Sequence, residues 1–344
     1  MNALEKIKHD LTVYFQRNNI TDVEQGITDL QNLLTPAILK ENNLEKDSPK
    51  IILAWTALQI QEDSPYRYYK SADLGEFIYS TEMHDIIHNL GISTIEEYYL
   101  YIKKIKDALL FEYSNSIKSG IYGHTIISMT YNSNKIEGSH LSEEETTNLF
   151  ETGTVFSSNN STYIPKDVEE SRGHFIMFNN MLKTIDEPLS ERLIKSFHYD
   201  LKCGVFEDKA NGYNIGEYKG RDNRVGNIVV ASAKDTPAEM KHLLDNYQPT
   251  DLDDLLCFHV NYETIHPFQD GNGRTGRLIL FRECLRLNLV PVLIYDDIKS
   301  EYIRSMNAYR EINDIGRFYN LALTLQKRYL DSIKPFIADY KDDE

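Results

Sequence analysis

Helical periodicity dominates this chain of 344 residues and limits the folds that it can adopt. Apolar residues recur at spacings of three and four through most of the sequence, whereas the alternation typical of half-buried strands is rare. The exception is a glycine-rich stretch, 211–237, in which Ile228, Val229 and Val230 belong to the best strand pattern. We therefore predict an all-α fold with one small β-hairpin.

The patterns divide the chain into three parts. The apolar pattern of residues 1–118 predicts several amphipathic helices. This region has no recognisable catalytic or ligand-binding motif, so we expect a helical accessory region. Residues 119–335 predict a second series of helices, one of them over 124–138 and a last one running from Tyr302 beyond Tyr319. Residues 336–344 form an acidic tail.

Composition narrows the function classes. The formal net charge is −16, which argues against a general nucleic-acid binder, because such proteins neutralise phosphates with Lys and Arg. No apolar run reaches the ~18 residues of a membrane span, and the N-terminus lacks the apolar core of a secretory signal. The three cysteines are scattered, which favours reduced thiols. We expect a cytoplasmic protein with neither nucleic acid nor membrane as a partner.

The segment from His266 to Arg277, HPFQDGNGRTGR, is the most informative part of the sequence. A helix is expected to end at His266, because Pro267 disfavours helical geometry in the residue before it. A glycine-rich turn and a second helix follow. Turn glycines let the backbone approach an anion closely, and a helix N-terminus adds partial positive charge. The segment therefore predicts an anion-binding corner.

Its side chains suit phosphate chemistry. His266 can accept a proton near neutral pH, and Asp270 is a hard oxygen ligand suited to Mg²⁺ on phosphates. Arg274 and Arg277 lie in the first turn of the second helix, where each cation costs about 0.3–1 kcal/mol unless it binds an anion. The alternative interpretation is a helix–turn–helix corner with solvated charges.

This segment resembles the Fic family motif HPFxxGNGRxxR and matches every defined position of it. The resemblance covers about residues 120–328. It implies a Fic-type helical core in which the stretch 211–237 is a flap over the active site. The strand-like part of this flap, Ile228, Val229 and Val230, could dock an extended target segment by strand addition; the alternative is a plain surface hairpin.

The resemblance further implies a protein adenylyltransferase, which moves AMP from ATP to a Ser, Thr or Tyr hydroxyl of a target protein or of itself. His266 would take the proton of that hydroxyl, whose oxygen attacks the α-phosphorus while pyrophosphate leaves. Asp270 would hold Mg²⁺, or another divalent metal, against the phosphates. The anion hole would consist of Asn272 and the backbone N–H groups of Gly271 and Gly273.

An inhibitory element is implied as well. Arg274 would clamp the β-phosphate and Arg277 the γ-phosphate. Upstream, Ser133 and Glu137 are four residues apart and share one face of a helix. The pattern [S/T]xxxE[G/N] marks an inhibitory helix in Fic proteins, so Glu137 would pair with Arg277, as in the class with an N-terminal intramolecular inhibitory helix. Otherwise, Glu137 is an ordinary surface residue before a C-cap glycine.

Three other functions stay open at this point. The same site could remove AMP from proteins, with Glu137 positioning or activating a water. It could transfer phosphate, although the family members that do so have Lys at the position of Gly273. It could also be a non-catalytic helical interaction module. A homodimer is a further expectation, since dimers could tune the inhibition.

Overall fold

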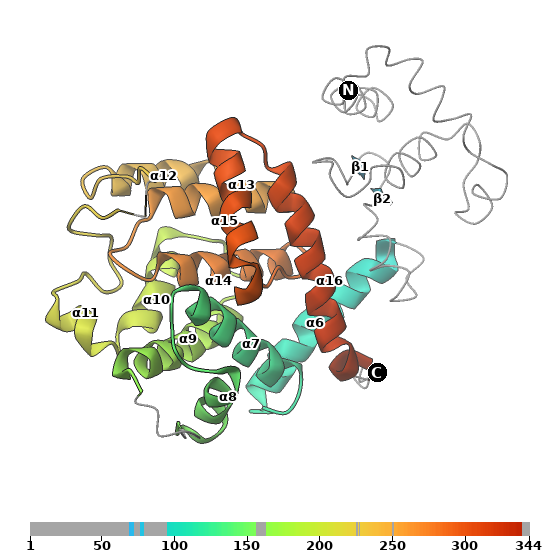
Figure 1. Cartoon of the computed structure of the whole chain (residues 1–344). Helices are drawn as coiled ribbons and strands as arrows, with labels where there is room; N and C mark the ends of the chain where they lie inside the picture. Colours follow the sequence, from blue (N-terminus) through green and yellow to red (C-terminus); the bar gives the residue numbers. More distant parts are fainter. Residues whose placement is uncertain are drawn as a thin grey trace, which may run out of the picture. The chain divides into compact units, whose positions relative to one another are not determined.

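The structure is a computed structural model of the whole chain, shown in Figure 1. It describes residues 69–71, 76–78, 95–155, 163–224, 226, 228–249 and 251–338. By its internal contacts the chain forms two compact units, Met1–Leu100 and Tyr101–Glu344. Most of the predicted accessory region, and the tail from residue 339 onward, lie outside the described residues.

The described residues of the first unit include two short strands. Strand β1 (Tyr69–Ser71) pairs antiparallel with β2 (Glu76–Ile78), and Lys70 lies opposite Phe77. The sequence predicted helices alone in this region, and for these residues that prediction was wrong. A strand of three residues is too short to show an alternating pattern.

The described part of the second unit is helical, which confirms the predicted fold class. Its helices are, in order, α6 (Ile95–Ser114, which begins in the first unit), α7 (Ile121–Ile136), α8 (Glu143–Thr152), α9 (Pro165–Lys183), α10 (Glu191–Lys202), α11 (Phe206–Ala210), α12 (Thr236–Asp245), α13 (Leu252–Ile265), α14 (Asn272–Arg286), the 3-10 turn η2 (Asp296–Ile298), α15 (Lys299–Ile312) and α16 (Gly316–Ala338).

Capping residues explain several helix boundaries. Helix α8 starts with a full capping box, in which Ser142 Oγ accepts from the Glu145 N–H (3.1 Å) and Glu145 Oε2 accepts from the Ser142 N–H (2.8 Å). The long helix predicted from Tyr302 is instead divided into α15 and α16. Asn313 adopts the left-handed conformation (φ 56°), which Asn tolerates better than most residues and which ends α15.

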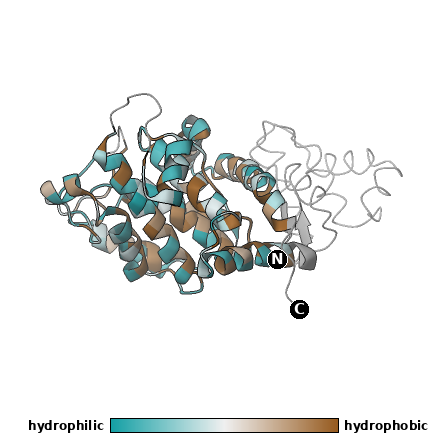
Figure 2. Ribbon diagram, turned by 90° about the horizontal axis from the view of Figure 1, so that it is seen from below, coloured by the Kyte–Doolittle hydropathy of each residue, from teal (hydrophilic) through white to brown (hydrophobic). Residues whose placement is uncertain are grey.

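Helix α14 is the centre of the second unit. Every residue from 272 to 285 is buried, and the helix packs against α7, α9, α10 and α13 (Figure 1). The surrounding helices carry both apolar and polar residues, as expected for helices with one face on the core (Figure 2). The N-terminus of α14 and the turn before it are therefore fixed by several neighbouring helices.

The stretch 211–237 does not form the predicted β-hairpin. Among its described residues, Ile228 makes an isolated bridge and none belongs to a strand. Gly226 has a positive φ of 53°, and the Val229 side chain is 89% exposed. A hairpin without further strands or a packed face is marginal in water, so the alternating pattern alone was insufficient here.

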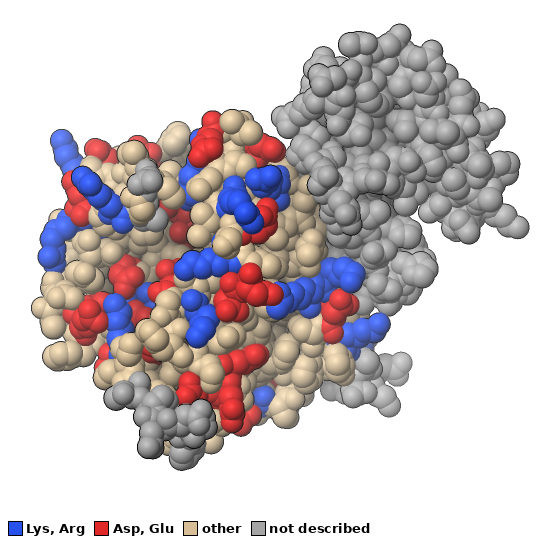
Figure 3. All heavy atoms as spheres, viewed as in Figure 1, with Lys and Arg blue, Asp and Glu red and all other residues tan. Residues whose placement is uncertain are grey.

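Charged side chains of both signs are interspersed on the face of the second unit shown in Figure 3. The negative net charge of the chain therefore does not make this face uniformly acidic. Among the helices that the structure describes, none combines the length and the apolarity needed to cross a bilayer.

Candidate active site

The predicted glycine-rich turn between two helices is present. His266 ends α13 in the left-handed conformation (φ 52°, ψ 62°), and its N–H still donates to the Tyr262 carbonyl oxygen (2.9 Å). Five residues later, Gly271 (φ 83°) is the N-cap of α14. Glycine adopts this φ without the steric cost that other residues bear. The turn between these two positions thus lies directly on the N-terminus of the buried helix α14.

Asn272 fixes the shape of this turn. Its Oδ1 accepts from the Phe268 N–H (2.7 Å), and its Nδ2 donates to the Phe268 carbonyl oxygen (2.8 Å). Both residues are buried. The sequence indicated Asn272 as an anion-hole donor, but its side chain holds the turn. Its backbone N–H, together with that of Gly273, lies at the helix start, where such groups have no partner within the helix.

His198, which the sequence analysis did not single out, supports the turn from α10. Its ring stacks on Phe268 with the centroids 3.8 Å apart. The Gly216 N–H donates to Nδ1 (2.9 Å), so Nε2 carries the proton and donates to the Asp270 carbonyl oxygen (3.0 Å). Burial lowers the pKa of His198 to about 3, which keeps the ring neutral.

Lys219 and Asn223, from the flap stretch, bind the same turn. Lys219 Nζ donates to the carbonyl oxygens of His266 (2.9 Å) and Ile265 (3.3 Å), and Asn223 Nδ2 donates to that of Phe268 (3.0 Å). A Lys that caps the last carbonyls of a helix is favourable there. Neither role was predictable from the sequence, because no spacing connects these residues with the motif.

His266 is in the state needed for a general base. Burial, followed by the nearby Lys219 cation, lowers the pKa of His266 to about 4, while the Glu137 and Asp270 carboxylates oppose this shift. The imidazole is therefore neutral at pH 7 and able to accept a proton.

Arg274 is buried and paired with carboxylates. Its Nη1 lies 2.5 Å from Glu170 Oε2, and its Nη2 lies 3.4 Å from Asp270 Oδ1. Burial lowers the pKa of Arg274, but these two carboxylates more than offset that effect, so the guanidinium stays charged. A phosphate bound by Arg274 would have to compete with Glu170, a residue that the sequence analysis missed.

Asp270 has the properties of a metal ligand for nucleotide phosphates. Burial raises its pKa, but Arg274 and Lys202 lower it more strongly, so the carboxylate is ionised. Its Oδ1 accepts from the Gly271 N–H (2.7 Å), its Oδ2 lies 2.8 Å from Lys202 Nζ, and the side chain is 33% exposed. Mg²⁺ is commonly held by one or two carboxylates plus substrate phosphates. The ionised, partly exposed carboxylate of Asp270 fits the role of such a protein ligand.

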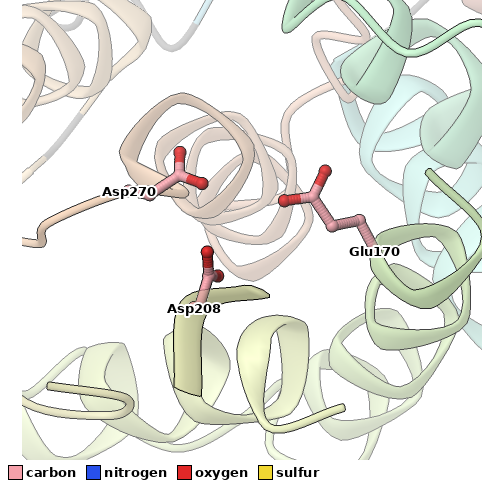
Figure 4. A group of neighbouring side chains, drawn as sticks. All are labelled: Glu170, Asp208 and Asp270. Carbon is pink, nitrogen blue, oxygen red and sulfur yellow. The ribbon is translucent and has the colours of Figure 1, made fainter. Parts of the chain in front are cut away.

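Figure 4 shows Asp270 together with Glu170 of α9 and Asp208 of α11. One carboxylate oxygen of each residue lies within 4.8 Å of the others. The figure shows the three side chains pointing toward one another from three separate segments.

Ser133 and Glu137 meet Arg277 across more than a hundred residues of sequence. Arg277 Nε donates to Ser133 Oγ (2.9 Å), and its Nη2 donates to the Ser133 carbonyl oxygen (2.9 Å) and to Glu137 Oε1 (2.7 Å). Arg277 is buried, whereas the Glu137 side chain is 38% exposed. Burial raises the pKa of Glu137, but Arg277 and Arg274 bring it below its ordinary value.

Gly273 makes room for this ion pair. A Cβ at this position would collide with Glu137 Oε1 and with Arg277 Nη1. The Glu137 carboxylate therefore lies against the first turn of α14, next to the backbone N–H groups that the sequence predicted as an anion hole.

Comparison with known proteins agrees with this geometry. The sequence model of the Fic/DOC family matches residues 188–283. A protein adenylyltransferase Fic of Drosophila mojavensis is 29% identical over 122 residues, which is 34% of this chain and 24% of the relative. A probable protein adenylyltransferase of Aquifex aeolicus is 26% identical over 140 residues, 38% of this chain and 39% of that protein. The chain thus spans well under half of these relatives.

Solved structures share the fold. A Fic domain containing signaling protein from Bacteroides thetaiotaomicron has a TM-score of 0.56 at 25% identity, covering 73% of this chain and 99% of the other. Fic-1 of Caenorhabditis elegans has a TM-score of 0.51 at 17% identity, with 96% and 98% covered, which is a likeness of fold alone. Together with the complete motif at His266–Arg277, the match of the family model identifies a Fic/DOC domain in this chain, over residues 188–283.

Proposed function

We propose that this Fic domain is a protein adenylyltransferase that transfers AMP from ATP to a protein hydroxyl. The observation that supports it most directly is the arrangement around the start of α14. A neutral histidine, an ionised aspartate and a helix N-terminus converge there. The names of the relatives, although they are similar over only part of their length, point to the same activity.

In the proposed reaction, the triphosphate binds across the N-terminus of α14. His266 removes the proton of the target hydroxyl, its oxygen forms a bond to the α-phosphorus, and the bond to pyrophosphate breaks. The backbone N–H groups of Asn272 and Gly273, at the start of α14, stabilise the charge that develops on the phosphoryl oxygens. Asp270 would hold Mg²⁺, which when bound neutralises phosphate charge.

We propose further that Glu137 inhibits this reaction. Its carboxylate accepts a hydrogen bond from the guanidinium of Arg277, the group that would otherwise bind the γ-phosphate. It also places a negative charge beside the N-terminus of α14, where it would repel the negatively charged phosphates of ATP. Both effects disfavour a productive triphosphate position.

The test compares wild type, Glu137→Gly and His266→Ala in Mg²⁺ with ATP labelled at either the α- or the γ-phosphate, alone and with lysate proteins. Transfer of the α-label alone, increased in Glu137→Gly and abolished in His266→Ala, is expected. Transfer of the γ-label would identify phosphate transfer instead. Absence of label from every folded variant would favour a non-catalytic interaction module.

Removal of AMP from a modified protein is the second candidate. Glu137 supports it, because its partly exposed carboxylate lies beside the anion-binding turn, where it could position a water. AMP-modified protein, prepared with Glu137→Gly, should then lose AMP when wild type is added. Glu137→Gly itself should be inactive in this direction, and equal rates for both proteins would exclude a role for Glu137.

A further inference from the structure

A buried lysine lies among the three acidic side chains of Figure 4. Lys202, the last residue of α10, is 1% exposed. Its Nζ lies 2.5 Å from Glu170 Oε1, 2.5 Å from Asp208 Oδ2 and 2.8 Å from Asp270 Oδ2. An ammonium group has three N–H donors and no acceptor. Lys202 thus donates hydrogen bonds to Glu170 and Asp270 and forms an ion pair with Asp208.

The three carboxylates would be incompatible without a cation at their centre. Glu170 and Asp208 are buried, and like charges at this separation repel strongly in a partly dry environment. Arg274 contacts Glu170 and Asp270 from one side, and Lys166 lies 3.6 Å from Asp270 Oδ2 but is 30% exposed. Among the residues that the structure describes, Lys202 is the cation that contacts all three acids.

Carboxylate oxygens that converge in this way are the ligands that hard divalent cations prefer. We propose that Lys202 is a positioning residue that takes the place of a divalent cation among Glu170, Asp208 and Asp270. Lys202 binds Oδ2 of Asp270. The metal of the reaction would therefore bind at the exposed side of the Asp270 carboxylate, and no additional metal would bind among the three acids. The role for the reaction depends on the proposed function, since Asp270 is the expected metal ligand.

The test counts metal ions in the full chain without ATP or target protein. Mn²⁺ is titrated into wild type, Lys202→Ala and Lys166→Ala, and free Mn²⁺ is followed by electron paramagnetic resonance. Lys202→Ala should gain one Mn²⁺ site that binds at least about tenfold more tightly than any site of wild type, because three carboxylates become available. Lys166→Ala removes a cation near the same acids but retains Lys202, and it should gain none.

A second variant separates the new site from a general increase in negative charge. Lys202→Ala/Asp208→Asn retains two of the acids and should lose the added Mn²⁺ site. If Lys202→Ala does not fold in chelator, its thermal unfolding transition should return on addition of Mn²⁺. No added Mn²⁺ in folded Lys202→Ala, or no recovery of an unfolded variant by Mn²⁺, would overturn the proposal.

The role in positioning Asp270 has its own measurement. In the Glu137→Gly background, Lys202→Ala should change the Mg²⁺ concentration that gives half-maximal labelling by at least about threefold, since Asp270 is no longer held from one side. An unchanged Mg²⁺ dependence with a lower maximal rate would indicate a purely structural role. The Mn²⁺ count requires no transferase activity, so it decides on the metal-excluding role of Lys202 even if the proposed function is wrong.

Discussion

Replacing Glu137 by glutamine tests the inhibitory ion pair with the smallest change of shape. Glutamine retains the length of the side chain but removes the charge that faces Arg277, whose Nη2 lies 2.7 Å from Glu137 Oε1. Arg277 retains both contacts with Ser133, so the guanidinium should keep its position. The variant therefore changes the charge at the γ-phosphate position more than the structure around it.

The magnitude follows from the burial of the two partners. Two unit charges about 4 Å apart interact by about 1 kcal/mol in water and about 4 kcal/mol at an effective dielectric of about 20. Arg277 is buried but the Glu137 side chain is 38% exposed, so solvent screening brings the expected contribution to about 1–2 kcal/mol. That free energy corresponds to roughly a 5- to 30-fold change in an equilibrium.

The assay is the rate of α-label transfer at ATP concentrations below saturation. Glu137→Gln should label roughly 5- to 30-fold faster than wild type, whereas Ser133→Ala, which retains the carboxylate, should change the rate much less. Because the pKa of Glu137 is below its ordinary value, the carboxylate is charged from pH 6 to 8, and the ratio should stay constant over that range. Folded Glu137→Gln with the wild-type rate would refute the reasoning.

Three further measurements test the site. Asn272→Ala leaves the buried backbone N–H and carbonyl of Phe268 unpaired, so urea unfolding should show a loss of about 2–3 kcal/mol; a loss below about 0.5 kcal/mol would contradict the role of Asn272 in the turn. Burial raises the pKa of Glu263, a residue of α13, from 4.5 to about 7, so wild-type stability should fall as pH rises from about 4.5 to 7 and then level off. Glu263→Gln should lack this fall and exceed wild type by about 1–3 kcal/mol at pH 8, and parallel pH profiles would contradict this. The pKa of His266 is lowered to about 4, so labelling by Glu137→Gly should be flat from pH 6 to 8 and decline only in more acidic buffer; a midpoint near pH 7 would argue against His266 as the base.

Features that depend on neighbours in the sequence were predictable. The helical class and the capping box at Ser142 follow from propensity and spacing, which act over a few residues. The end of α13 at His266 follows in the same way, because Pro267 disfavours helical geometry in the residue before it, although its left-handed conformation did not follow from the sequence. The β-hairpin at Ile228–Val230 failed, because a strand needs a partner that the alternating pattern does not specify.

The sequence by itself thus determined which chemical groups are available, since the motif from His266 to Arg277 lies in a single local turn. The tertiary structure decided which of these groups are paired. Arg277 meets Glu137, and Asp270 meets Lys202, only because α7 and α10 both pack against α14. Residue type fixes a charge, but its pKa and its partner depend on burial and distance, which only the folded chain defines.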